Sequence, residues 1–298
     1  MQSFILCAGL GTRLAPLTHI LPKPLMPMFL KPLVHHIMDR HYAAGVRAFA
    51  LNTSQHALAW DKAFPSQSYR GCPVHLSHEA QPLDSGGGLK KIMPFIKKDA
   101  PLIVQNGDIY TDIPIDELLL AHQKSGKMLT LALRTVDGKK NVGFDPASGL
   151  VTDLRPALGV DAGSSQFAGV YIMEPSIAEL FPTPEDEETE FSIIPIWLEL
   201  IKRGEVAGAV FDWANWYEIG SPQQYLDAVM EIPSAQRTHD TAIIASDALI
   251  SEDCVIGELS HIKSGVELID CIVWPRTHVE AGRYERCILT PCIKVPCL

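Results

Sequence analysis

Glycines and cationic side chains gather near the start of the chain, directly after an apolar segment. Residues Phe4–Ala8 read as a buried strand, and Gly9, Gly11 and Arg13 follow it, with Lys23 further along between two prolines. A strand that ends in a glycine loop presents backbone N–H groups at close range, and a cation beside them suits a polyphosphate. The chemistry that this pattern predicts is the binding of a nucleoside triphosphate.

Two common phosphate-binding loops do not fit this segment. A P-loop needs Gly-Lys-Ser or Gly-Lys-Thr after four spacer residues, and the segment contains no such sequence. The dinucleotide fingerprint requires a third small residue at the position where Leu14 stands, and no convincing acidic residue follows at the distance of a ribose. The pattern therefore indicates a different class of triphosphate site.

The loop and several later segments resemble the sugar-1-phosphate nucleotidylyltransferases, also called nucleotide-sugar pyrophosphorylases. The matching segments are residues 9–18, 22–25, 83–88, 106–108, 167–169 and 216–222. The resemblance implies transfer of a nucleotidyl group from an NTP to a sugar 1-phosphate, with release of pyrophosphate. The attacking phosphate oxygen is already an anion, so the site has to align two anions and stabilise developing charge rather than supply a strong base.

The resemblance assigns roles to the residues that match the family's motifs. Arg13 and Lys23 are the implied catalytic cations, Arg13 toward the β- and γ-phosphates and Lys23 toward the α-phosphate. The implied nucleotide-binding residues are Ala8, Gly9, Gly11, Thr12, Glu79, Ser85 and Gly86. An ionised Glu79 only accepts hydrogen bonds, so it suits the ring N–H of guanine, uracil or thymine better than adenine.

Two carboxylates are implied as ligands of Mg²⁺, the cofactor that the family uses. Asp108 follows the apolar segment Leu102–Gln105 and an Asn-Gly turn, so its carboxylate is expected at the carboxyl end of a buried strand. The second family carboxylate is an Asp in a Trp-x-Asp-x-Gly segment, where this chain has Glu218. Glu218 keeps the charge and extends its reach by one methylene group.

The resemblance also implies a sugar-phosphate site at Gly143, Arg155 and Gly169. Arg155 stands where the family has the Lys of a Glu-Lys-Pro segment, and Leu154 stands where it has the Glu. The cation for the sugar phosphate is kept, but the carboxylate that grips sugar hydroxyls is missing. The identity of the sugar therefore does not transfer from the family.

Composition restricts the class of partner. The chain has 298 residues, 47% of them hydrophobic, and a formal net charge of −10, which makes a nucleic-acid partner unexpected. No apolar run approaches the ~20 residues of a membrane span, and no export signal precedes the first strand. Seven scattered cysteines then predict reduced thiols in a cytoplasmic protein. The expected partners are the NTP and the sugar 1-phosphate, with neither nucleic acid nor membrane.

Apolar runs alternate with helical patterns through the first two thirds of the chain. This alternation predicts an α/β fold with a Rossmann-like, mostly parallel sheet. The predicted strands are residues 4–8, 48–52, 74–78, 102–105, 128–134 and 167–173, and the predicted helices are residues 34–44, 89–96, 193–203 and 223–231. A nucleotidyltransferase catalytic domain is expected over residues 1–231, followed by a linker over residues 232–240.

The end of the chain carries a repeat. Cys254, Cys271 and Cys287 each lie in a short β-branched segment, at intervals of 17 and 16 residues. One turn of a triangular β-solenoid takes ~18 residues, so residues 241–298 are predicted to form a short left-handed β-helix with the thiols stacked inside as small apolar groups. The resemblance implies that such a tail can join copies of the chain into a homo-oligomer.

The sequence leaves the substrates open among three alternatives. The β-helical tail slightly favours guanylyl transfer from GTP to mannose 1-phosphate, as in the mannose-1-phosphate guanylyltransferases. Residues 83–88 favour uridylyl transfer to an amino-sugar 1-phosphate, as in the N-acetylmuramate-1-phosphate uridylyltransferases. The third alternative is a non-catalytic subunit that senses nucleotide sugars; Glu218 supports it, whereas the presence of Arg13, Lys23 and Asp108 opposes it.

Overall fold

The computed structural model describes residues 1–136, 138–160, 163–182, 189–233 and 236–297. The chain forms two compact units, the first of Met1–Leu10 with Ile37–Trp216 and the second of Gly11–His36 with Tyr217–Leu298. Each unit is made of two separate stretches of the chain, whereas each expected domain is one continuous stretch. The two divisions therefore cannot be compared directly, and the expected boundaries at residues 231 and 241 stay a prediction. Residues 234–235 of the expected linker and residue 298 of the expected β-helix lie outside the described residues.

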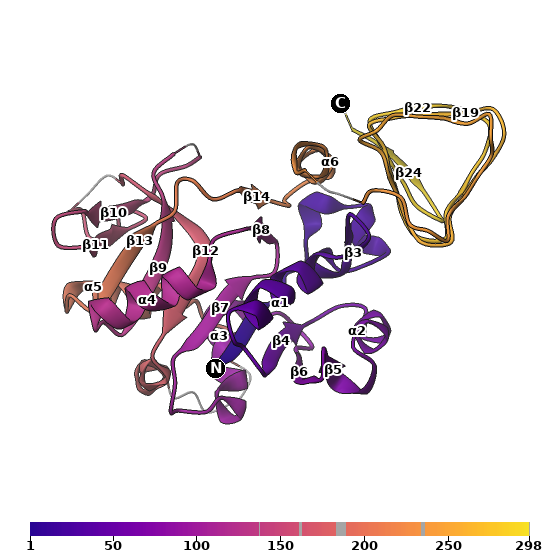
Figure 1. The fold of residues 1–298 in the computed structure, drawn as a ribbon. Coiled ribbons are helices and arrows are strands. Elements are labelled where there is room, and N and C mark those ends of the chain that lie inside the picture. The colour runs from indigo at the N-terminus through magenta and orange to yellow at the C-terminus, as the bar shows by residue number, and fades with distance from the viewer. Residues whose placement is uncertain (137, 161–162, 183–188, 234–235, 298) are drawn as a thin grey trace. The chain divides into compact units, whose positions relative to one another are not determined.

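The first unit is built on one large sheet (Figure 1). The strands of this unit are β1 (Gln2–Leu6), β4 (Phe49–Thr53), β5 (Ser68–Tyr69), β6 (Cys72–His78), β7 (Leu102–Asn106), β8 (Ile109–Thr111), β9 (Leu129–Arg134), β10 (Val142–Asp145), β11 (Leu150–Leu154), β12 (Gln166–Met173) and β13 (Val206–Val210). All of them except β8 belong to the large sheet. Its helices are α2 (Ala57–Ala63), α3 (Asp84–Ile92), α4 (Ile115–Ser125) and α5 (Ile194–Lys202), with 3₁₀ segments at Pro65–Gln67, Met93–Phe95 and Pro175–Leu180. Helix α1 (Leu33–Ala43) and strand β14 (Trp216–Glu218) contribute residues to both units.

The sheet contains a block of four neighbouring parallel strands, β7, β1, β4 and β6. Among the described residues the strand order is β10-β11-β13-β9-β12-β7-β1-β4-β6-β5. Strands β6, β4, β1 and β7 run parallel, β9 and β13 run parallel, and β12 runs antiparallel to both of its neighbours. The predicted α/β fold with a mostly parallel sheet is confirmed. Parallel strands end at the same edge, so the loops after β1, β4, β6 and β7 lie next to one another.

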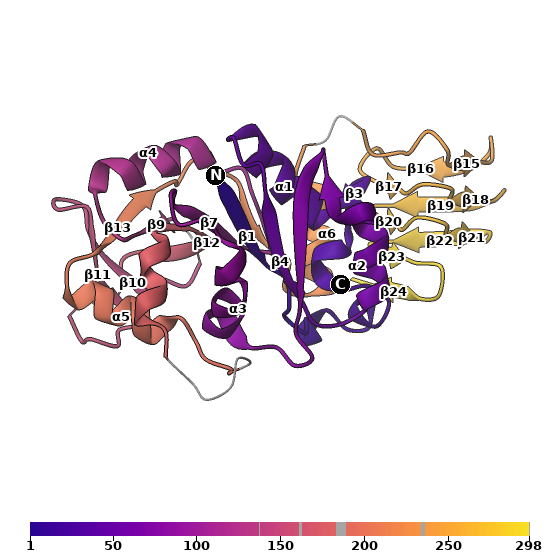
Figure 2. The same cartoon turned by 90° about the horizontal axis from the view of Figure 1, so that it is seen from below.

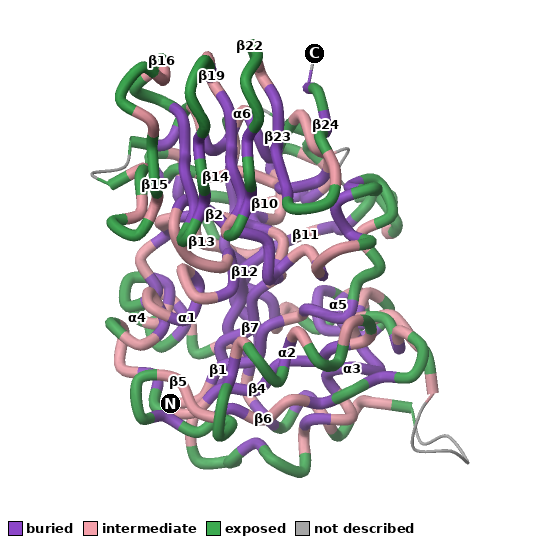
Figure 3. Tube along the Cα trace, turned by 90° about the vertical axis from the view of Figure 1, so that its right-hand side faces the viewer, coloured by how far each residue is buried: buried purple, intermediate pink, exposed green. Residues whose placement is uncertain are grey.

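Apolar side chains fill both faces of this sheet. Figure 3 shows buried residues in β1, β4, β7 and β12, and all six residues of β9 are buried as well. In Figure 2, α4 covers one face, and α3 and α5 cover the other. Phe4, Val104, Leu131 and Trp197 belong to one buried cluster, which holds the central strands and α5 together. In the part of the chain that the structure describes, none of the helices has the length and apolar character that crossing a membrane requires.

Helix α3 differs from its prediction. The sequence predicts a helix over residues 89–96, after three consecutive glycines, and each glycine inside a helix costs about 1 kcal/mol relative to alanine. The structure places the helix over Asp84–Ile92, with Gly86, Gly87 and Gly88 inside it. A Cβ atom on Gly86 would collide with Phe191, and one on Gly87 would lie 2.6 Å from the carbonyl oxygen of Thr189. Close packing against this segment, which lies far away in sequence, overrides the low helix propensity.

The second unit combines short turns with a coil of short strands. Its 3₁₀ segments are η1 (Thr12–Leu14), η2 (Leu17–His19) and η3 (Lys23–Leu25), and its longer helix is α6 (Pro222–Glu231). Its strands are β2 (Pro27–Met28), β3 (Lys31–Pro32), β15 (Ile243–Ile244), β16 (Leu249–Ile250), β17 (Val255–Ile256), β18 (His261–Ile262), β19 (Val266–Ile269), β20 (Ile272–Val273), β21 (His278–Val279), β22 (Gly282–Glu285), β23 (Cys287–Leu289) and β24 (Lys294–Pro296).

Strands β15 to β23 wind into a coil that is triangular in Figure 1. Each side of the triangle is a parallel ladder: β15-β18-β21, β16-β19-β22 and β17-β20-β23, with β24 added antiparallel to β23. Cys254, Cys271 and Cys287 are 2%, 0% and 3% exposed and belong to the interior cluster. The three thiols thus lie inside the coil, as the sequence predicts, and its parallel ladders are consistent with a β-helix. The left-handed β-helix itself stays a prediction.

Polar contacts join α6 to the coil within the second unit. Asp227 on α6 accepts from Arg286 at 2.6 Å. Arg237 donates to the carbonyl oxygens of Val229 and Asp253 at 3.0 and 2.9 Å. These contacts hold the helix that follows the Trp-Tyr-Glu segment against the coil.

Candidate functional site

The glycine loop begins at the carboxyl end of β1, where β4 holds it. The backbone N–H of Cys7 donates to Asn52 Oδ1 at 2.7 Å, and the Ala8 carbonyl oxygen accepts from Ser54 Oγ at 2.6 Å. Gly9 is exposed, and a Cβ atom placed on it would meet nothing within 4 Å. The start of the predicted nucleotide loop is therefore fixed, and the backbone at Gly9 is open to a ligand.

Asp108 lies on the other side of β1, in the turn between β7 and β8. The preceding Gly107 donates its N–H to the carbonyl oxygen of Leu6 at 2.9 Å, which ties this turn to the end of β1. Burial raises the pKa of the Cys7 thiol well above its ordinary value, and the negative charge of Asp108 raises it further. The Asp108 carboxylate therefore exerts its field at the point where the glycine loop begins.

The rest of the loop belongs to the second unit, where a left-handed glycine sets its path. Gly11 has φ of +60°, and a Cβ atom on it would lie 2.9 Å from Thr18 Cγ2 and 3.7 Å from two carbon atoms of Lys23. Glycine meets both demands, because it adopts positive φ without a Cβ clash. Thr12 and Arg13 then form η1, with both residues exposed. The turn thus brings the loop against the aliphatic stem of Lys23.

Arg13 and Glu218 form an ion pair in the second unit. The guanidinium Nη2 lies 3.1 Å from Glu218 Oε1, with 67% and 37% of the two side chains exposed. A Cβ atom on Gly220 would lie 3.4 Å from both terminal nitrogens of Arg13, so the glycine leaves room for the guanidinium. The predicted phosphate-binding cation and the predicted metal ligand therefore neutralise each other in this structure.

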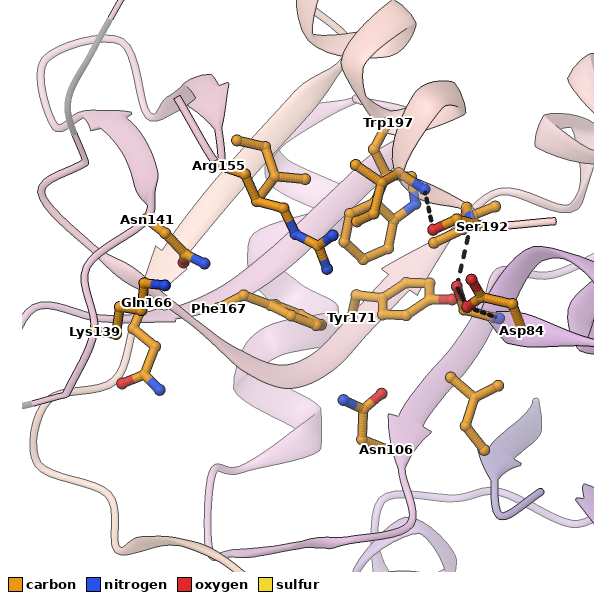
Figure 4. Close-up of a pocket in the computed structure, with 15 residues that line it drawn as sticks. Asp84, Asn106, Lys139, Asn141, Arg155, Gln166, Phe167, Tyr171, Ser192 and Trp197 are labelled. Atoms are coloured by element: carbon orange, nitrogen blue, oxygen red, sulfur yellow. Dashed lines mark hydrogen bonds between the residues drawn. The ribbon is translucent and has the colours of Figure 1, made fainter. Parts of the chain in front are cut away.

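A pocket of about 350 Å³ lies in the first unit beside β7 and β12. Figure 4 shows Lys139, Asn141 and Gln166 on one side of it and Asp84 and Ser192 on the other, with Phe167 and Tyr171 between them. Trp197 packs edge-to-face against Phe167 and Tyr171, at centroid distances of 5.4 and 4.8 Å. The arrangement gives an aromatic wall with polar groups at both ends, which is typical of a small-ligand site.

Arg155 reaches this pocket from a turn that Asp153 organises. Asp153 is fully buried, and its carboxylate accepts from the backbone N–H groups of Leu154, Leu158 and Val160 at 2.7, 2.9 and 3.0 Å. Arg155 has φ of +56°, and its N–H donates to the Asn141 carbonyl oxygen at 2.6 Å. The buried carboxylate thus holds the unusual backbone that presents the exposed guanidinium.

The glycines on the sugar side lie at irregular points of the sheet. Gly143 precedes a register shift between β10 and β11. Gly169 lies within a shift between β12 and β9, with φ of +80°, and a Cβ atom on it would lie 2.8 Å from Ile109 Cγ1. A side chain at residue 169 would therefore be strained and would also collide with β8.

Two polar atoms in the pocket wall have no hydrogen-bond partner among the described residues. They are the hydroxyl of Tyr171, a side chain 1% exposed, and Oε1 of Gln166. Burial raises the pKa of the Tyr171 hydroxyl, so it stays protonated and can donate. Unpaired polar groups are costly in a protein interior, which makes both atoms candidates for contact with a ligand.

The pocket also includes Ser85 at the start of α3. Its hydroxyl donates to Asp84 Oδ1 at 3.0 Å and accepts from the N–H of Ile193 at 3.2 Å. Gly86 donates its N–H to the Phe191 carbonyl oxygen at 3.0 Å. The close approach that Gly86 allows is thus to the protein's own backbone, and its predicted contact with a base stays a prediction.

Comparison with known proteins identifies the family. A family model described as nucleotidyl transferase matches residues 2–235. The chain belongs to the nucleotidyl transferase family. This nucleotidyltransferase is 28% identical over 301 residues to a mannose-1-phosphate guanylyltransferase of Mycobacterium tuberculosis, an alignment that covers 95% of this chain and 82% of that protein. The predicted family resemblance and enzyme class are confirmed.

Solved structures support the same fold. One is a Bacillus anthracis protein assigned as a glucose-1-phosphate thymidylyltransferase and solved with sucrose; the TM-score is 0.67 at 18% identity, over 79% of this chain and 98% of that one. Another is HddC from Yersinia pseudotuberculosis complexed with GMP-PN; the TM-score is 0.60 at 24% identity, over 76% of this chain and 97% of that one.

The two carboxylates that the sequence predicts as Mg²⁺ ligands belong to different units, Asp108 to the first and Glu218 to the second. Asp108 and Glu218 offer hard carboxylate oxygens, the ligand type that Mg²⁺ prefers. Among the described residues no three His, Cys, Asp or Glu side chains are arranged to hold a metal by themselves. Mg²⁺ that is held by one or two carboxylates completes its shell with phosphate oxygens and water.

Several residues of the site escape the sequence analysis. Asn52, Tyr171 and Trp197 carry no motif, because an Asn at a strand end and aromatic residues in a helix or strand are common in any core. Asp153 is different, because an Asp just before Leu-Arg-Pro is a usual signal for a turn held by a side chain. Lys139 and Asn141 lie in a polar segment whose path only the tertiary structure defines.

Proposed function

We propose that the chain catalyses transfer of the guanylyl group of GTP to mannose 1-phosphate, with Mg²⁺ as cofactor. One observation carries the choice of substrates: the match to the Mycobacterium mannose-1-phosphate guanylyltransferase runs over 95% of this chain, tail included. In the reaction an oxygen of the sugar phosphate bonds to the α-phosphorus, and the bond to the β-phosphate oxygen breaks, so that pyrophosphate leaves with the electron pair. Bound Mg²⁺ would stabilise negative charge on the phosphate oxygens.

The protein's own groups bind and align the two substrates in this proposal. The glycine loop, with Ala8, Gly9, Gly11 and Thr12, receives the triphosphate through backbone N–H groups. Arg13 leaves Glu218 to contact the β- and γ-phosphates, and Lys23 contacts the α-phosphate. The exchange is feasible because an exposed ion pair contributes only about 0–1 kcal/mol. Asp108 and Glu218 would hold the metal.

The sugar phosphate occupies the pocket that Arg155 enters. Support comes from the pocket's size, its aromatic wall and the guanidinium beside it. Gly143 and Gly169 are not among the residues that line this pocket, so their contact with the sugar stays a prediction from the family resemblance. Hydroxyls of the hexose satisfy Tyr171 and Gln166, the residues with unpartnered buried atoms.

A second candidate is uridylyl transfer to an amino-sugar 1-phosphate. It is favoured by Leu154, which is 3% exposed and lines the pocket at the position where the family has a carboxylate for sugar hydroxyls. A sugar with fewer free hydroxyls, such as an N-acylated one, would lose less from that change.

The test is a pyrophosphate-release assay with MgCl₂ across five NTPs and three acceptors: mannose 1-phosphate, glucose 1-phosphate and N-acetylglucosamine 1-phosphate. We expect the highest kcat/KM with GTP and mannose 1-phosphate, and no turnover with EDTA. Arg13→Ala should lower kcat by ~10²-fold, the scale of one lost preorganised donor, without changing the unfolding midpoint. A best pair of UTP and N-acetylglucosamine 1-phosphate would support the second candidate, and no turnover with any pair would support a regulatory subunit.

A further inference from the structure

Two buried polar side chains, Asn52 and Glu79, connect the loops at the carboxyl edge of the sheet. Asn52 is the second-to-last residue of β4 and is 3% exposed. Glu79 directly follows β6 and is 1% exposed. Asn52 Nδ2 donates to Glu79 Oε1 at 2.8 Å. Each partner also accepts from a backbone N–H: Asn52 Oδ1 from Cys7 at 2.7 Å, and Glu79 Oε2 from Leu83 at 2.8 Å.

The direction of these hydrogen bonds is fixed by the atoms involved. A backbone N–H can only donate, so the atom of the pair that faces Cys7 and the atom that faces Leu83 must both be acceptors. The contact between the two side chains then needs one donor and one acceptor. The amide nitrogen of Asn52 is the donor, and Glu79 Oε1 is the acceptor. The Asn52–Glu79 pair thereby joins the residue that starts the glycine loop to the residue that precedes α3.

Helix α3 packs directly on this pair. A Cβ atom on Gly88 would lie 2.7 Å from Asn52 Nδ2 and 2.9 Å from Glu79 Oε1, so only glycine fits there. Glu79 is also anchored by its own N–H, which donates to the Thr53 carbonyl oxygen at 2.7 Å. The position of the pair is therefore fixed by β4, β6 and α3 together.

We propose that Glu79 and Asn52 are positioning residues, which set the distance between the glycine loop and the start of α3 and so set the affinity for nucleotide. Glu79 acts through Asn52 and Leu83 and does not itself receive the base. The inference rests on the proposed function in one respect, namely that the nucleotide binds at these two loops.

An exchange of the two side-chain types tests the proposal, because it keeps a donor and an acceptor at each of the three hydrogen bonds described above. In the double variant, which combines Asn52→Asp with Glu79→Gln, the new carboxylate at residue 52 accepts from Cys7 and from the new amide at residue 79. The oxygen of that amide then accepts from Leu83. Asn52→Asp alone makes two carboxylate oxygens face each other, and Glu79→Gln alone makes two donors face each other. Each single variant therefore has one unmet buried contact.

The measurements are the Kd of GTP and of UTP by calorimetry with MgCl₂, and the KM values for NTP and for sugar 1-phosphate. Each single variant should weaken nucleotide binding by about tenfold or more, the scale of one unmet buried hydrogen bond. The double variant should return to within about threefold of the wild type. The KM for sugar 1-phosphate should change little in all three variants, which a general loss of stability would not produce.

Glu174→Gln serves as the matched control. Glu174 Oε1 lies 3.1 Å from Nε2 of buried His122 on α4, away from the nucleotide loops, so its replacement should lower the unfolding midpoint and leave Kd unchanged. If Glu79 itself receives the base, the double variant will bind as weakly as Glu79→Gln, and the proposal is overturned. Wild-type affinity in both single variants, or a double variant that does not fold, overturns it as well. Absence of nucleotide binding by the wild type would instead refute the proposed function, and this inference with it.

Discussion

Replacement of Asp153 tests how the fold presents Arg155 to the sugar pocket. The fully buried carboxylate accepts three backbone N–H groups, and Leu154 and Leu158 share Oδ1 while Val160 donates to Oδ2. Asp153→Asn keeps the shape of the side chain but places an amide NH₂ opposite a backbone N–H. Asp153→Ala removes all three acceptor contacts.

The structure sets the size of the expected effects. Hydrogen bonds to a charged group contribute about 1.5–3 kcal/mol each, and a buried N–H left without a partner costs about 1–3 kcal/mol. Asp153→Asn loses the hydrogen bond from Val160, and the hydrogen bonds from Leu154 and Leu158 then go to a neutral amide oxygen instead of a charged carboxylate. We therefore expect a loss of about 2 kcal/mol in the free energy of unfolding. Asp153→Ala also leaves the buried N–H of Leu154 unmet, while water can reach the exposed Val160, so we expect about 3–4 kcal/mol.

The assay combines chemical unfolding with steady-state kinetics. Because the left-handed backbone of Arg155 depends on this turn, the KM for sugar 1-phosphate should rise about tenfold in Asp153→Asn, while the KM for NTP stays near the wild-type value. Asp145→Asn is the matched control, since Asp145 accepts from Ala147 and Ser148 in an exposed turn where water can replace it. An Asp153→Asn variant that is destabilised but keeps the wild-type KM for sugar phosphate would refute the link between this turn and the substrate.

Three further predictions concern single buried groups. Tyr171→Phe removes an unpartnered hydroxyl, so the free energy of unfolding should stay the same or rise by up to about 1 kcal/mol, while the KM for sugar 1-phosphate rises several-fold in the pyrophosphate-release assay. Burial lowers the pKa of His41 from 6.5 to about 4. Between pH 6.5 and about pH 4 the unfolded chain therefore binds more protons than the folded protein, so the free energy of unfolding falls as the pH falls. Unfolding at about pH 7 and about pH 5 should show a loss of about 2 kcal/mol that His41→Gln does not share. Gly169→Ala forces a Cβ atom to within 2.8 Å of Ile109 at a residue with φ of +80°. Chemical unfolding should show a loss of about 1–3 kcal/mol in the free energy of unfolding. Wild-type stability would mean that β8 moves to make room for the new side chain.

Much of the fold follows from local patterns in the sequence. Apolar runs such as Phe4–Ala8 and Leu102–Gln105 become adjacent parallel strands, because each is bounded by turn residues and is buried on both faces. The repeated thiols predict the coil, since a side chain at the same point of each turn meets the same neighbours. Helix α3 is the exception, because the reason for its glycines lies in Phe191 and Asn52, which are distant in sequence.

In the candidate site, too, some features follow from the local sequence and others depend on the tertiary structure. The sequence alone determines the kind of chemistry, because a glycine loop followed by Arg13 needs only residues that are neighbours in the chain. Tertiary structure decides which groups are free to act. It holds the Glu79 carboxylate between the Asn52 amide and the Leu83 N–H, and it pairs Arg13 with Glu218, 205 positions away. Burial and hydrogen-bond partners depend on segments that meet only after folding, so no local pattern can specify them.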